Sequence, residues 1–395
     1  MKVCYITMQF PVPSETFAAS DVRMLKERGI DVSVYALRGM HRDYDSMVQQ
    51  RELGGVDICS VGFLRAVAGF FYALAHPVSL FFLLAFLVRE DLNKVRYFLK
   101  MLLLVPSSFY IFKQLKKKNP DVVHLFWGHY PSLVGYLVLI KMPNVKLTVF
   151  LGAYDLECKL GVSVCVANRA YGVFTHAKTN LKELEKIGIH NPAIHVAYRG
   201  VDVARLSSII TKGKPRESHS WLSAGRLLPS KGFDAVIELF FFASQLYGKA
   251  VLTVAGDGPE RDSLLVLAKK LGVADKVKLA GHLSHEELVG LMAGSEFFFL
   301  FSNKTGERLP NVIKEAMLSG CICFTTPTPG INELIEHGVT GFIVDHNNSK
   351  QCLGLIKGLG LEARTEIRLA ASRCVLEKFD AKKNMNVYVS VWDGA

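Results

Sequence analysis

The sequence predicts an α/β protein with two doubly wound parallel sheets facing a central cleft. Three observations lead to this prediction. The chain has 395 residues, enough for two domains; short apolar runs alternate with helical patterns; and one polar stretch, Thr211–Ser220, separates two series of such runs. Most runs are continuously apolar, as is typical of strands covered by helices on both faces.

The apolar runs define the expected strands. In the first half these are Val3–Thr7, Val32–Ala36, Val122–Phe126, Lys146–Phe150, Gly172–His176 and Ile194–Ala197. In the second half they are Trp221–Ala224, Val251–Ala255, Val277–Ala280, Phe297–Phe301, Cys321–Thr325 and Phe342–Val344. We expect an N-terminal domain over 1–205, a C-terminal domain over 206–375, and a helix over 376–395 that crosses back to the N-terminal domain.

One region departs from this alternation and predicts a helical insertion at about 62–118. Ala66–Val88 contains no Asp, Glu, Lys or Arg, and His76 and Pro77 divide it into two apolar pieces. Lys94–Lys118 carries seven Lys or Arg and no acid. This composition indicates contact with an anionic membrane surface. Core helices with a basic face, or a hairpin inserted into the bilayer, remain alternatives.

The composition of the chain limits its possible binding partners and its cellular compartment. The formal charge of +11 favours an anionic partner such as a phosphate, a nucleotide, a nucleic acid or a lipid surface. No nucleic-acid-binding module accompanies the basic run Lys113–Lys118, so we expect no nucleic acid. The eight cysteines lack CxxC or zinc spacing, and the N-terminal apolar run is too short for a signal peptide, which predicts a cytoplasmic protein.

A stretch at Thr305–Gly320, TGERLPNVIKEAMLSG, suggests a ligand site. Glu307 and Glu315 stand eight positions apart, around a helix that is expected to start at Pro310. The N-terminus of a helix attracts phosphate, and a carboxylate accepts hydrogen bonds from neighbouring hydroxyls. The pattern therefore favours a sugar nucleotide. Two solvent-facing glutamates are the alternative.

Two further stretches combine a strand, a loop and a helix. Arg226 and Lys231 flank the loop of SAGRLLPSKGFD, where cations would stabilise a departing diphosphate. Gly256 and Gly258 lie in the turn of VAGDGPER, where a base could approach the backbone, although this is also an ordinary turn sequence.

In combination these stretches resemble the C-terminal domain of retaining glycosyltransferases of family 4, which have two Rossmann-like domains in the GT-B fold. The resemblance implies that Glu307 contacts the donor sugar, that Arg226 and Lys231 hold the diphosphate, and that Glu315 binds the ribose. It also implies that the backbone of Leu309, Pro310 and Asn311 completes the donor site.

The N-terminal half resembles members of this family that build bacterial surface polysaccharides. The resemblance places six residues on the acceptor side: Ser14, Glu15, Thr16, His129, Tyr154 and Asp155. Gly152 stands where many relatives have a histidine near the reacting sugar, and His129 is the candidate to replace it. Arg308 replaces a small residue commonly found after the first glutamate, which is expected to narrow the choice of donor.

The resemblance implies transfer of a sugar, with retention, from a nucleoside-diphosphate sugar to a glycan or polyprenyl-linked acceptor. No cofactor and no metal are expected, because Arg226, Lys231 and the helix N-terminus supply the positive charge. We expect a cytoplasmic enzyme that is peripheral on the inner face of the plasma membrane. A catalytically silent nucleotide-sugar-binding partner of a glycan-assembly complex, or a sugar-nucleotide epimerase, are the alternatives.

Overall fold

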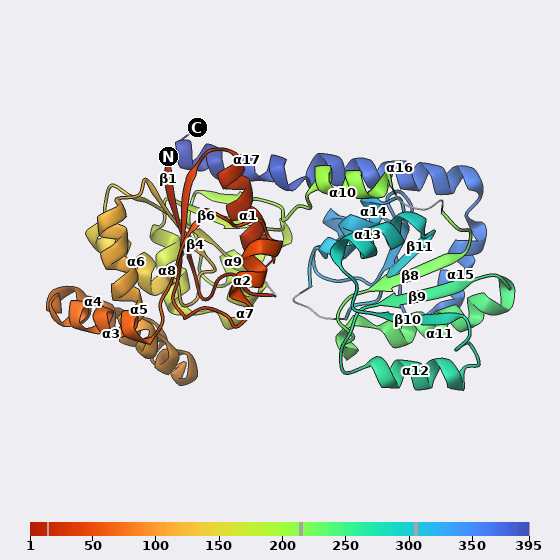
Figure 1. Ribbon diagram of the computed structural model, residues 1–395, viewed down its shortest axis with the longest axis horizontal. Coiled ribbons are helices and arrows are strands. Elements are labelled where there is room, and N and C mark those ends of the chain that lie inside the picture. The colour runs from red at the N-terminus through yellow and green to blue at the C-terminus, as the bar shows by residue number, and fades with distance from the viewer. Residues whose placement is uncertain (14–15, 213–215, 304–306, 395) are drawn as a thin grey trace. The chain divides into compact units, whose positions relative to one another are not determined.

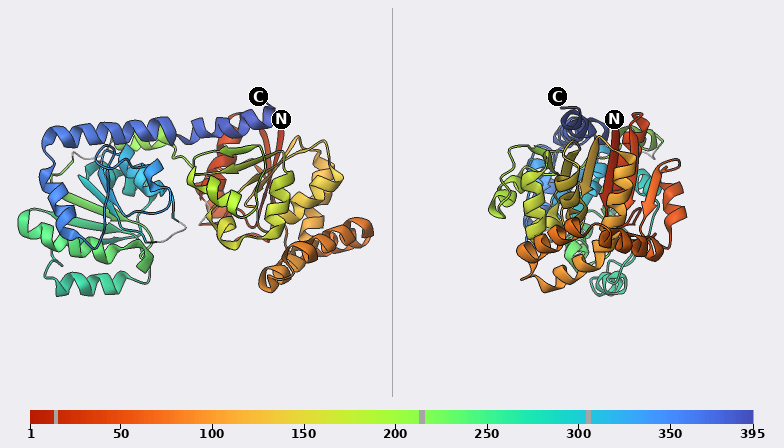
Figure 2. Two further views of the ribbon diagram at one scale, coloured as in Figure 1. Left: turned by 180° about the vertical axis from the view of Figure 1, so that it is seen from behind. Right: turned by 90° about the vertical axis from the view of Figure 1, so that its left-hand side faces the viewer.

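A computed structural model describes residues 1–13, 16–212, 216–303 and 307–394. The chain forms two compact units, an N-terminal unit of Met1–Ala197 with Met385–Ala395 and a C-terminal unit of Tyr198–Asn384. Each unit has a parallel sheet with helices on both faces (Figures 1 and 2). The predicted α/β class with two doubly wound sheets is confirmed. The second unit begins at Tyr198, eight residues before the position expected from the sequence.

The sheet of the N-terminal unit has seven parallel strands in the order β3-β2-β1-β4-β5-β6-β7. The strands are β1 (Lys2–Thr7), β2 (Asp31–Ala36), β3 (Asp57–Ser60), β4 (Val122–Phe126), β5 (Lys146–Phe150), β6 (Gly172–Thr175) and β7 (Ile194–Val196). The edge strand β3 is absent from the sequence prediction. Its sequence, DICS, is partly exposed and half polar, and therefore lacks the continuous apolar pattern of a buried strand.

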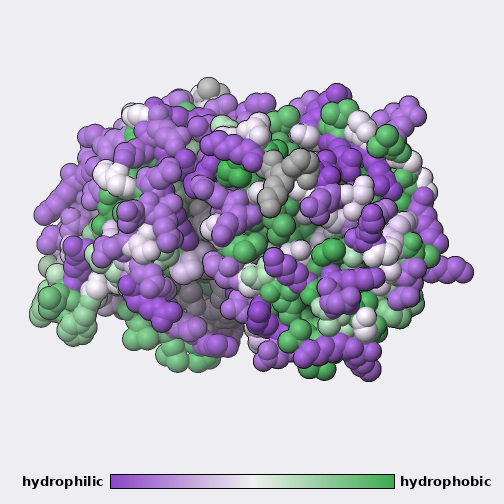
Figure 3. Space-filling model, turned by 45° about the vertical axis from the view of Figure 1, so that its right-hand side comes forward, coloured by the Kyte–Doolittle hydropathy of each residue, from purple (hydrophilic) through white to green (hydrophobic). Residues whose placement is uncertain are grey.

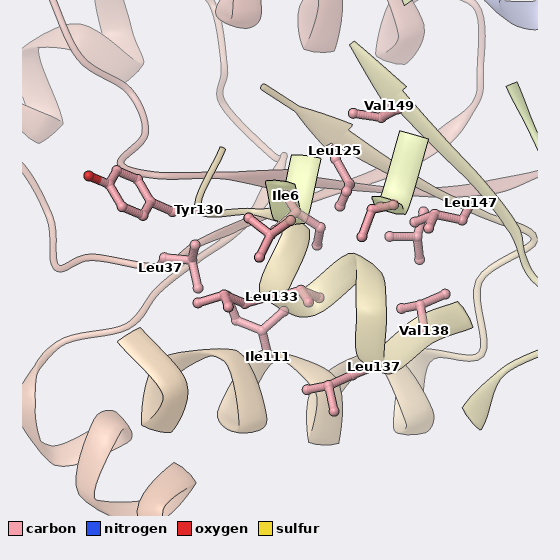
Figure 4. Close-up of a cluster of buried hydrophobic side chains, with 14 of the residues drawn as sticks. Ile6, Leu37, Ile111, Leu125, Tyr130, Leu133, Leu137, Val138, Leu147 and Val149 are labelled. Atoms are coloured by element: carbon pink, nitrogen blue, oxygen red, sulfur yellow. The ribbon is translucent and has the colours of Figure 1, made fainter. Parts of the chain in front are cut away.

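Six helices connect these strands outside the insertion. They are α1 (Thr16–Glu27), α2 (Tyr44–Gln50), α6 (Ser132–Lys141), α7 (Ala153–Cys158), α8 (Gly161–Arg169) and α9 (Thr179–Lys186). On one face of the sheet, Leu133 and Leu137 of α6 pack with Leu125 of β4 and Leu147 of β5 in the core (Figure 4). All four side chains are almost completely buried, which makes this layer a main source of stability for the unit.

The insertion consists of three helices, α3 (Phe63–Leu74), α4 (Pro77–Asp91) and α5 (Val95–Lys118). The break that the sequence predicts at His76 and Pro77 is present, because α3 and α4 meet there at an angle of 104°. Gly69 brings α3 against α5, since a Cβ at this position would lie 2.0 Å from the Pro106 carbonyl oxygen. At the other end, the buried Asp91 carboxylate accepts the backbone N–H groups of Gly161 (2.9 Å) and Val162 (2.8 Å) at the start of α8.

The sheet of the C-terminal unit has six parallel strands in the order β10-β9-β8-β11-β12-β13. They are β8 (Ser220–Ala224), β9 (Val251–Ala255), β10 (Val277–Gly281), β11 (Phe297–Leu300), β12 (Ile322–Thr325) and β13 (Phe342–Ile343). The accompanying helices are α10 (Val203–Ile210), η1 (Pro229–Lys231), α11 (Phe233–Leu246), α12 (Arg261–Lys270), α13 (His285–Gly294), α14 (Asn311–Leu318), η2 (Ile331–Glu333), α15 (Ser349–Gly358) and α16 (Leu361–Lys378).

The last helix, α17 (Ala381–Asp393), completes the N-terminal unit. The Trp392 indole N–H donates to the Thr148 hydroxyl at 3.1 Å, and the Tyr388 ring stacks on Phe174 with the centroids 4.3 Å apart. These contacts join residues more than 200 positions apart in the sequence to one core.

Candidate active site

The motifs of the C-terminal unit all follow strands of its sheet. Chain order reverses between β8 and β11, because β9 and β10 continue on one side of β8 while β11 and β12 continue on the other. Such a switch point leaves space beyond the carboxyl ends of the strands, where doubly wound proteins bind ligands. The loops after β8 and β11 carry Arg226, Lys231 and Glu307, so three predicted donor-site residues gather at this point.

Lys231 and Glu307 form an ion pair in the structure. The Lys231 Nζ contacts Oε1 of the carboxylate, and the Ser302 hydroxyl contacts Oε2. Only 18% of the Lys231 side chain and 16% of the Glu307 side chain are exposed, so solvent screens this pair weakly. Both residues were predicted from the sequence as parts of a donor site, but in contact with different parts of the donor. The structure adds that they contact each other.

Arg226 is exposed, and its loop is held by two glycines of the neighbouring loop. A Cβ at Gly256 would lie 1.8 Å from the Gly225 carbonyl oxygen, and one at Gly258 would lie 2.5 Å from the Leu227 carbonyl oxygen. Leu227 N–H also donates to the Asp257 carbonyl oxygen at 3.0 Å. The glycines therefore position the segment that carries Arg226, and their predicted contact with a base stays a prediction.

The helix that the sequence predicts from Pro310 begins one residue later than expected. Pro310 is the N-cap of α14, and Asn311 is the first helical residue. Leu309 and Pro310 are buried. The positive end of the helix dipole thus lies at the Leu309–Asn311 segment, which the sequence analysis assigned to the donor phosphates.

Glu315 of α14 is paired with a residue that the sequence analysis missed. His285, the first residue of α13, lies with Nε2 3.1 Å from Glu315 Oε1, and this hydrogen bond raises the pKa of His285. The reciprocal bonds between Ser284 and Glu287 fix the start of α13 and so the position of His285. The S-x-x-E spacing of that capping box is a recognisable signal for the helix start, but not for the contact with Glu315.

Lys314 is a second residue that sequence reasoning missed. It is completely buried, and its Nζ donates to the Arg199 carbonyl oxygen at 2.6 Å and to Asn311 Oδ1 at 3.0 Å. Burial lowers the pKa of Lys314 to about 7. Because a neutral amine has two N–H groups to donate, both hydrogen bonds are compatible with the uncharged form. Lys314 therefore holds the side chain of Asn311 at the start of α14.

The acceptor-side residues are spread over several loops of the N-terminal unit. Ser14 and Glu15 lie outside the described residues, and Thr16 is the exposed first residue of α1. Asp155 is 3% exposed and accepts the backbone N–H groups of Gly128 and Gly152, each at 3.0 Å. Burial raises the pKa of Asp155 to about 7. Asp155 thus joins the loop after β4 to the loop after β5, a structural role that leaves direct acceptor contact a prediction.

The presence of glycine at position 152, where the resemblance leads one to expect a histidine, has a steric explanation. A Cβ there would lie 2.1 Å from Cζ3 of Trp127, so the indole occupies the space that a side chain at position 152 would need. His129 is 8% exposed, and burial lowers its pKa to about 3, which keeps the imidazole neutral. Its ring lies edge-on to Tyr154, with the centroids 5.3 Å apart.

Within the residues that the structure describes, no group of three or more His, Cys, Asp or Glu side chains is arranged to hold a metal ion.

Comparison with known proteins agrees with this geometry. Residues 208–364 match the model of the family "Glycosyl transferases group 1". An uncharacterized glycosyltransferase of Haemophilus influenzae is 27% identical over 277 residues, which cover 69% of each chain. The lipopolysaccharide core biosynthesis glycosyltransferase LpsE of Rhizobium meliloti is 29% identical over 170 residues, 43% of this chain and 46% of that protein.

Among solved structures, Anabaena HepE in complex with UDP superposes with a TM-score of 0.71 at 17% identity, and each chain is covered completely. This likeness confirms the GT-B fold. The match to the family model confirms the resemblance drawn from the motifs of the C-terminal unit: residues 208–364 of this unit carry a glycosyl transferases group 1 domain. Its relatives include proteins named for lipopolysaccharide and colanic acid biosynthesis.

Proposed function

We propose that the protein transfers a sugar, with retention of anomeric configuration, from a nucleoside-diphosphate sugar to a glycan or polyprenyl-linked acceptor in cell-surface polysaccharide synthesis. The observation that carries the proposal is the group formed by Arg226, Lys231 and Glu307 where the chain order of the C-terminal sheet reverses. Two cations and one carboxylate at that point fit a ligand that combines phosphates with a hydroxylated ring.

The charges suggest how the donor lies. The diphosphate would meet Arg226 and the N-terminus of α14, where the helix dipole is positive. Glu307 would accept hydrogen bonds from the donor sugar, and Glu315 from the ribose. Because Lys231 already contacts Glu307, its charge reduces the repulsion between this carboxylate and a neighbouring phosphate.

The same groups account for the chemistry. Negative charge grows on the departing phosphate as the sugar bond breaks, and Arg226 and Lys231 would stabilise it without a metal ion. The acceptor hydroxyl would attack from the face that the phosphate leaves, and a phosphate oxygen would take its proton. This route explains how retention is possible without a second carboxylate as nucleophile.

The substitutions Glu307→Gln and Arg226→Ala test the assignment. Each is expected to lower turnover of the correct radiolabelled nucleotide sugar by about a hundredfold or more. Glu362→Gln and Arg373→Ala, both exposed on α16, are matched controls that should retain activity. Near-normal turnover in both test variants would reject the site. Comparison of the anomeric configuration of donor and product by NMR tests retention.

A nucleotide-sugar-binding partner without catalytic activity is the second candidate, favoured by the space at position 152 that Trp127 fills. A panel of UDP-, GDP-, dTDP-, ADP- and CMP-linked sugars separates the two functions. Transfer or hydrolysis supports the enzyme, whereas a thermal shift without turnover supports the binding partner. Isomerisation of the sugar would indicate an epimerase.

A cytoplasmic position on the inner face of the membrane is the second element of the proposal. Half of the exposed large hydrophobic side chains among the described residues, 14 of 28, lie between Phe63 and Leu103 of the insertion. Phe63 and Leu64 are each 81% exposed. Hydrophobic side chains gather at the lower left of Figure 3, the side on which α3 and α4 lie in Figure 1. Isolated apolar residues are common on surfaces, but a dense group is typical of an interaction surface.

Charge and anchoring favour a lipid surface. Residues 63–118 contain nine Lys or Arg and two acids, which suits anionic headgroups. Asp91 and the stacked rings of Phe86 and Tyr136, 4.0 Å apart, hold α4 to the rest of the unit, so its exposed face is firmly positioned. Among the described residues, one helix, Val95–Lys118, is long and apolar enough to span a membrane, and 44% of its apolar window is buried. The bent pair of α3 and α4 passes the same test if it is taken as one span.

Vesicle flotation tests this surface. The full chain should float with phosphatidylglycerol vesicles more than with phosphatidylcholine vesicles, and Phe63→Ser/Leu64→Ser should reduce flotation. The matched control is Leu265→Ser/Val266→Ser on α12, an exposed apolar pair outside the insertion. Equal flotation of both double variants would contradict a membrane role for the insertion.

A further inference from the structure

Trp127 combines an unusual backbone conformation with a half-buried position. It follows β4 directly and has a φ of +85°, in the left-handed region that bulky side chains rarely adopt. Such a conformation is sterically unfavourable for a residue with a Cβ atom. Residues held in this way cluster at functional sites, where the surrounding structure enforces a particular side-chain direction.

The neighbours of Trp127 fix the orientation of the indole. One part of the ring covers Gly152, and Phe126 and Phe150 lie edge-on to it with centroids 5.4 and 5.5 Å away. Phe17 lies edge-on at 6.1 Å. The other two tryptophans of the chain, Trp221 and Trp392, are 1% and 2% exposed. Of the three tryptophans, all of which lie within the described residues, Trp127 is therefore the one that is only half-buried.

An unsatisfied imidazole lies beside it. The centroids of Trp127 and His129 are 6.3 Å apart, and His129 is more than nine-tenths buried. Among the described residues, no group forms a hydrogen bond with its Nδ1. Buried polar atoms without partners are uncommon and costly, so this nitrogen points to a ligand or a water that would satisfy it. Tyr154, 43% exposed, lies edge-on to His129 on another side.

The chemistry of the three side chains selects the ligand. An aromatic face accepts the C–H groups of a sugar ring, while a neutral imidazole and a phenol exchange hydrogen bonds with hydroxyls. At neutral pH none of the three is charged, because burial lowers the pKa of His129 and raises that of Tyr154. An uncharged hydroxylated ring fits this surface better than a phosphate does.

We infer that Trp127, His129 and Tyr154 form a subsite for a neutral pyranose ring of the glycan acceptor, with the Trp127 indole as its platform. This inference rests on the proposed transfer function and adds the substrate contact of the N-terminal unit. His129 acts in it as a hydrogen-bonding group.

Acrylamide quenching of tryptophan fluorescence in the full chain tests the subsite. Since Trp221 and Trp392 are buried, quenching reports mainly on Trp127. The probes are the methyl glycosides of glucose, galactose, mannose and N-acetylglucosamine, with UDP and UDP-glucose as separate arms. We expect at least one glycoside to protect Trp127 from acrylamide.

Variants identify the contact. Trp127→Leu should weaken binding of that glycoside, measured by saturation-transfer NMR, by about tenfold, and Trp127→Phe should weaken it less. Tyr154→Leu should also weaken it, whereas Tyr171→Leu is the matched control. Tyr171 is 45% exposed and lies before the amino end of β6, whereas Trp127 follows the carboxyl end of β4. Near-ultraviolet circular dichroism checks that each variant is folded.

Three outcomes would overturn the inference: no glycoside protects Trp127, a glycoside binds Trp127→Leu as tightly as the native chain, or only UDP-glucose protects Trp127. The last would assign the platform to the donor sugar. If UDP-glucose is turned over while no glycoside protects Trp127, the subsite fails and the transfer function stands. If a glycoside protects Trp127 but none of the nucleotide sugars in the panel binds, the transfer function fails.

Discussion

The Glu315 carboxylate of α14 is held by His285 of α13, with 3.1 Å between His285 Nε2 and Glu315 Oε1. Two helices thereby share one hydrogen bond, between residues thirty positions apart in the sequence, at the proposed ribose site.

This contact predicts a change in the titration of His285. The hydrogen bond to Glu315 raises the pKa of His285, so Glu315→Gln should lower it. Because the pKa of His285 is raised in the folded state, the stabilisation that this hydrogen bond gives is fully present below the unfolded pKa of about 6.5. This stabilisation is lost as pH rises through the folded pKa of His285. Imidazole NMR titration of both proteins measures the shift, and an unchanged His285 pKa in Glu315→Gln would contradict the pairing.

The ion pair of Lys231 and Glu307 predicts non-additive effects on stability. Either single change, Lys231→Met or Glu307→Gln, leaves a mostly buried group without its partner and should cost about 1–3 kcal/mol. The double variant should cost less than the sum of the two. Urea unfolding measures the three values, with Lys278→Met, an exposed lysine on β10, as the control. Strict additivity would show that the two groups do not interact in solution.

Lys314 predicts a rise in stability with pH. Its folded pKa of about 7 lies below the value of about 10.4 in an unfolded chain, so the unfolded state binds more protons between these values. The free energy of unfolding should therefore rise from pH 7 towards pH 10. Lys314→Met should remove this part of the slope. Parallel urea titrations at several pH values provide the test, and identical slopes in both proteins would place the Lys314 pKa near its usual value.

Three glycine substitutions form a graded series. Gly354→Ala meets open space within helix α15 and should stabilise the protein by about 0.5–1 kcal/mol. Gly272→Ala also meets open space, but the φ of Gly272 is +70°, in the left-handed region, so this substitution should cost about 1–2 kcal/mol. Gly256→Ala adds a contact 1.8 Å from the Gly225 carbonyl oxygen and should be the most destabilising of the three. Thermal unfolding ranks the stabilities of the variants. A small loss of stability in Gly256→Ala would show that the loops after β8 and β9 are not in close contact.

Much of the fold was predictable because its strands are short, apolar and buried on both faces. The exception, β3, is a partly exposed edge strand whose four residues include Asp57 and Ser60. The loops that carry Arg226 and Glu307 were predictable as well, because strand-loop-helix order is a local property of the sequence.

Contacts across the fold were not predictable in this way. Lys231 meets Glu307 76 positions away, and Lys314 reaches the carbonyl of Arg199 115 positions away. The absence of a side chain at Gly152 was visible in the sequence, but its cause was not, because the indole of Trp127 fills that space only after β4 and β5 pair.

The return of α17 to the N-terminal unit has a consequence for biosynthesis. Tyr388 and Trp392 pack on strands that leave the ribosome hundreds of residues earlier than they do. These two residues are translated only after the entire C-terminal unit. The part of the N-terminal sheet that Tyr388 and Trp392 cover therefore stays exposed until α17 has been synthesised, and during this period a chaperone could bind it.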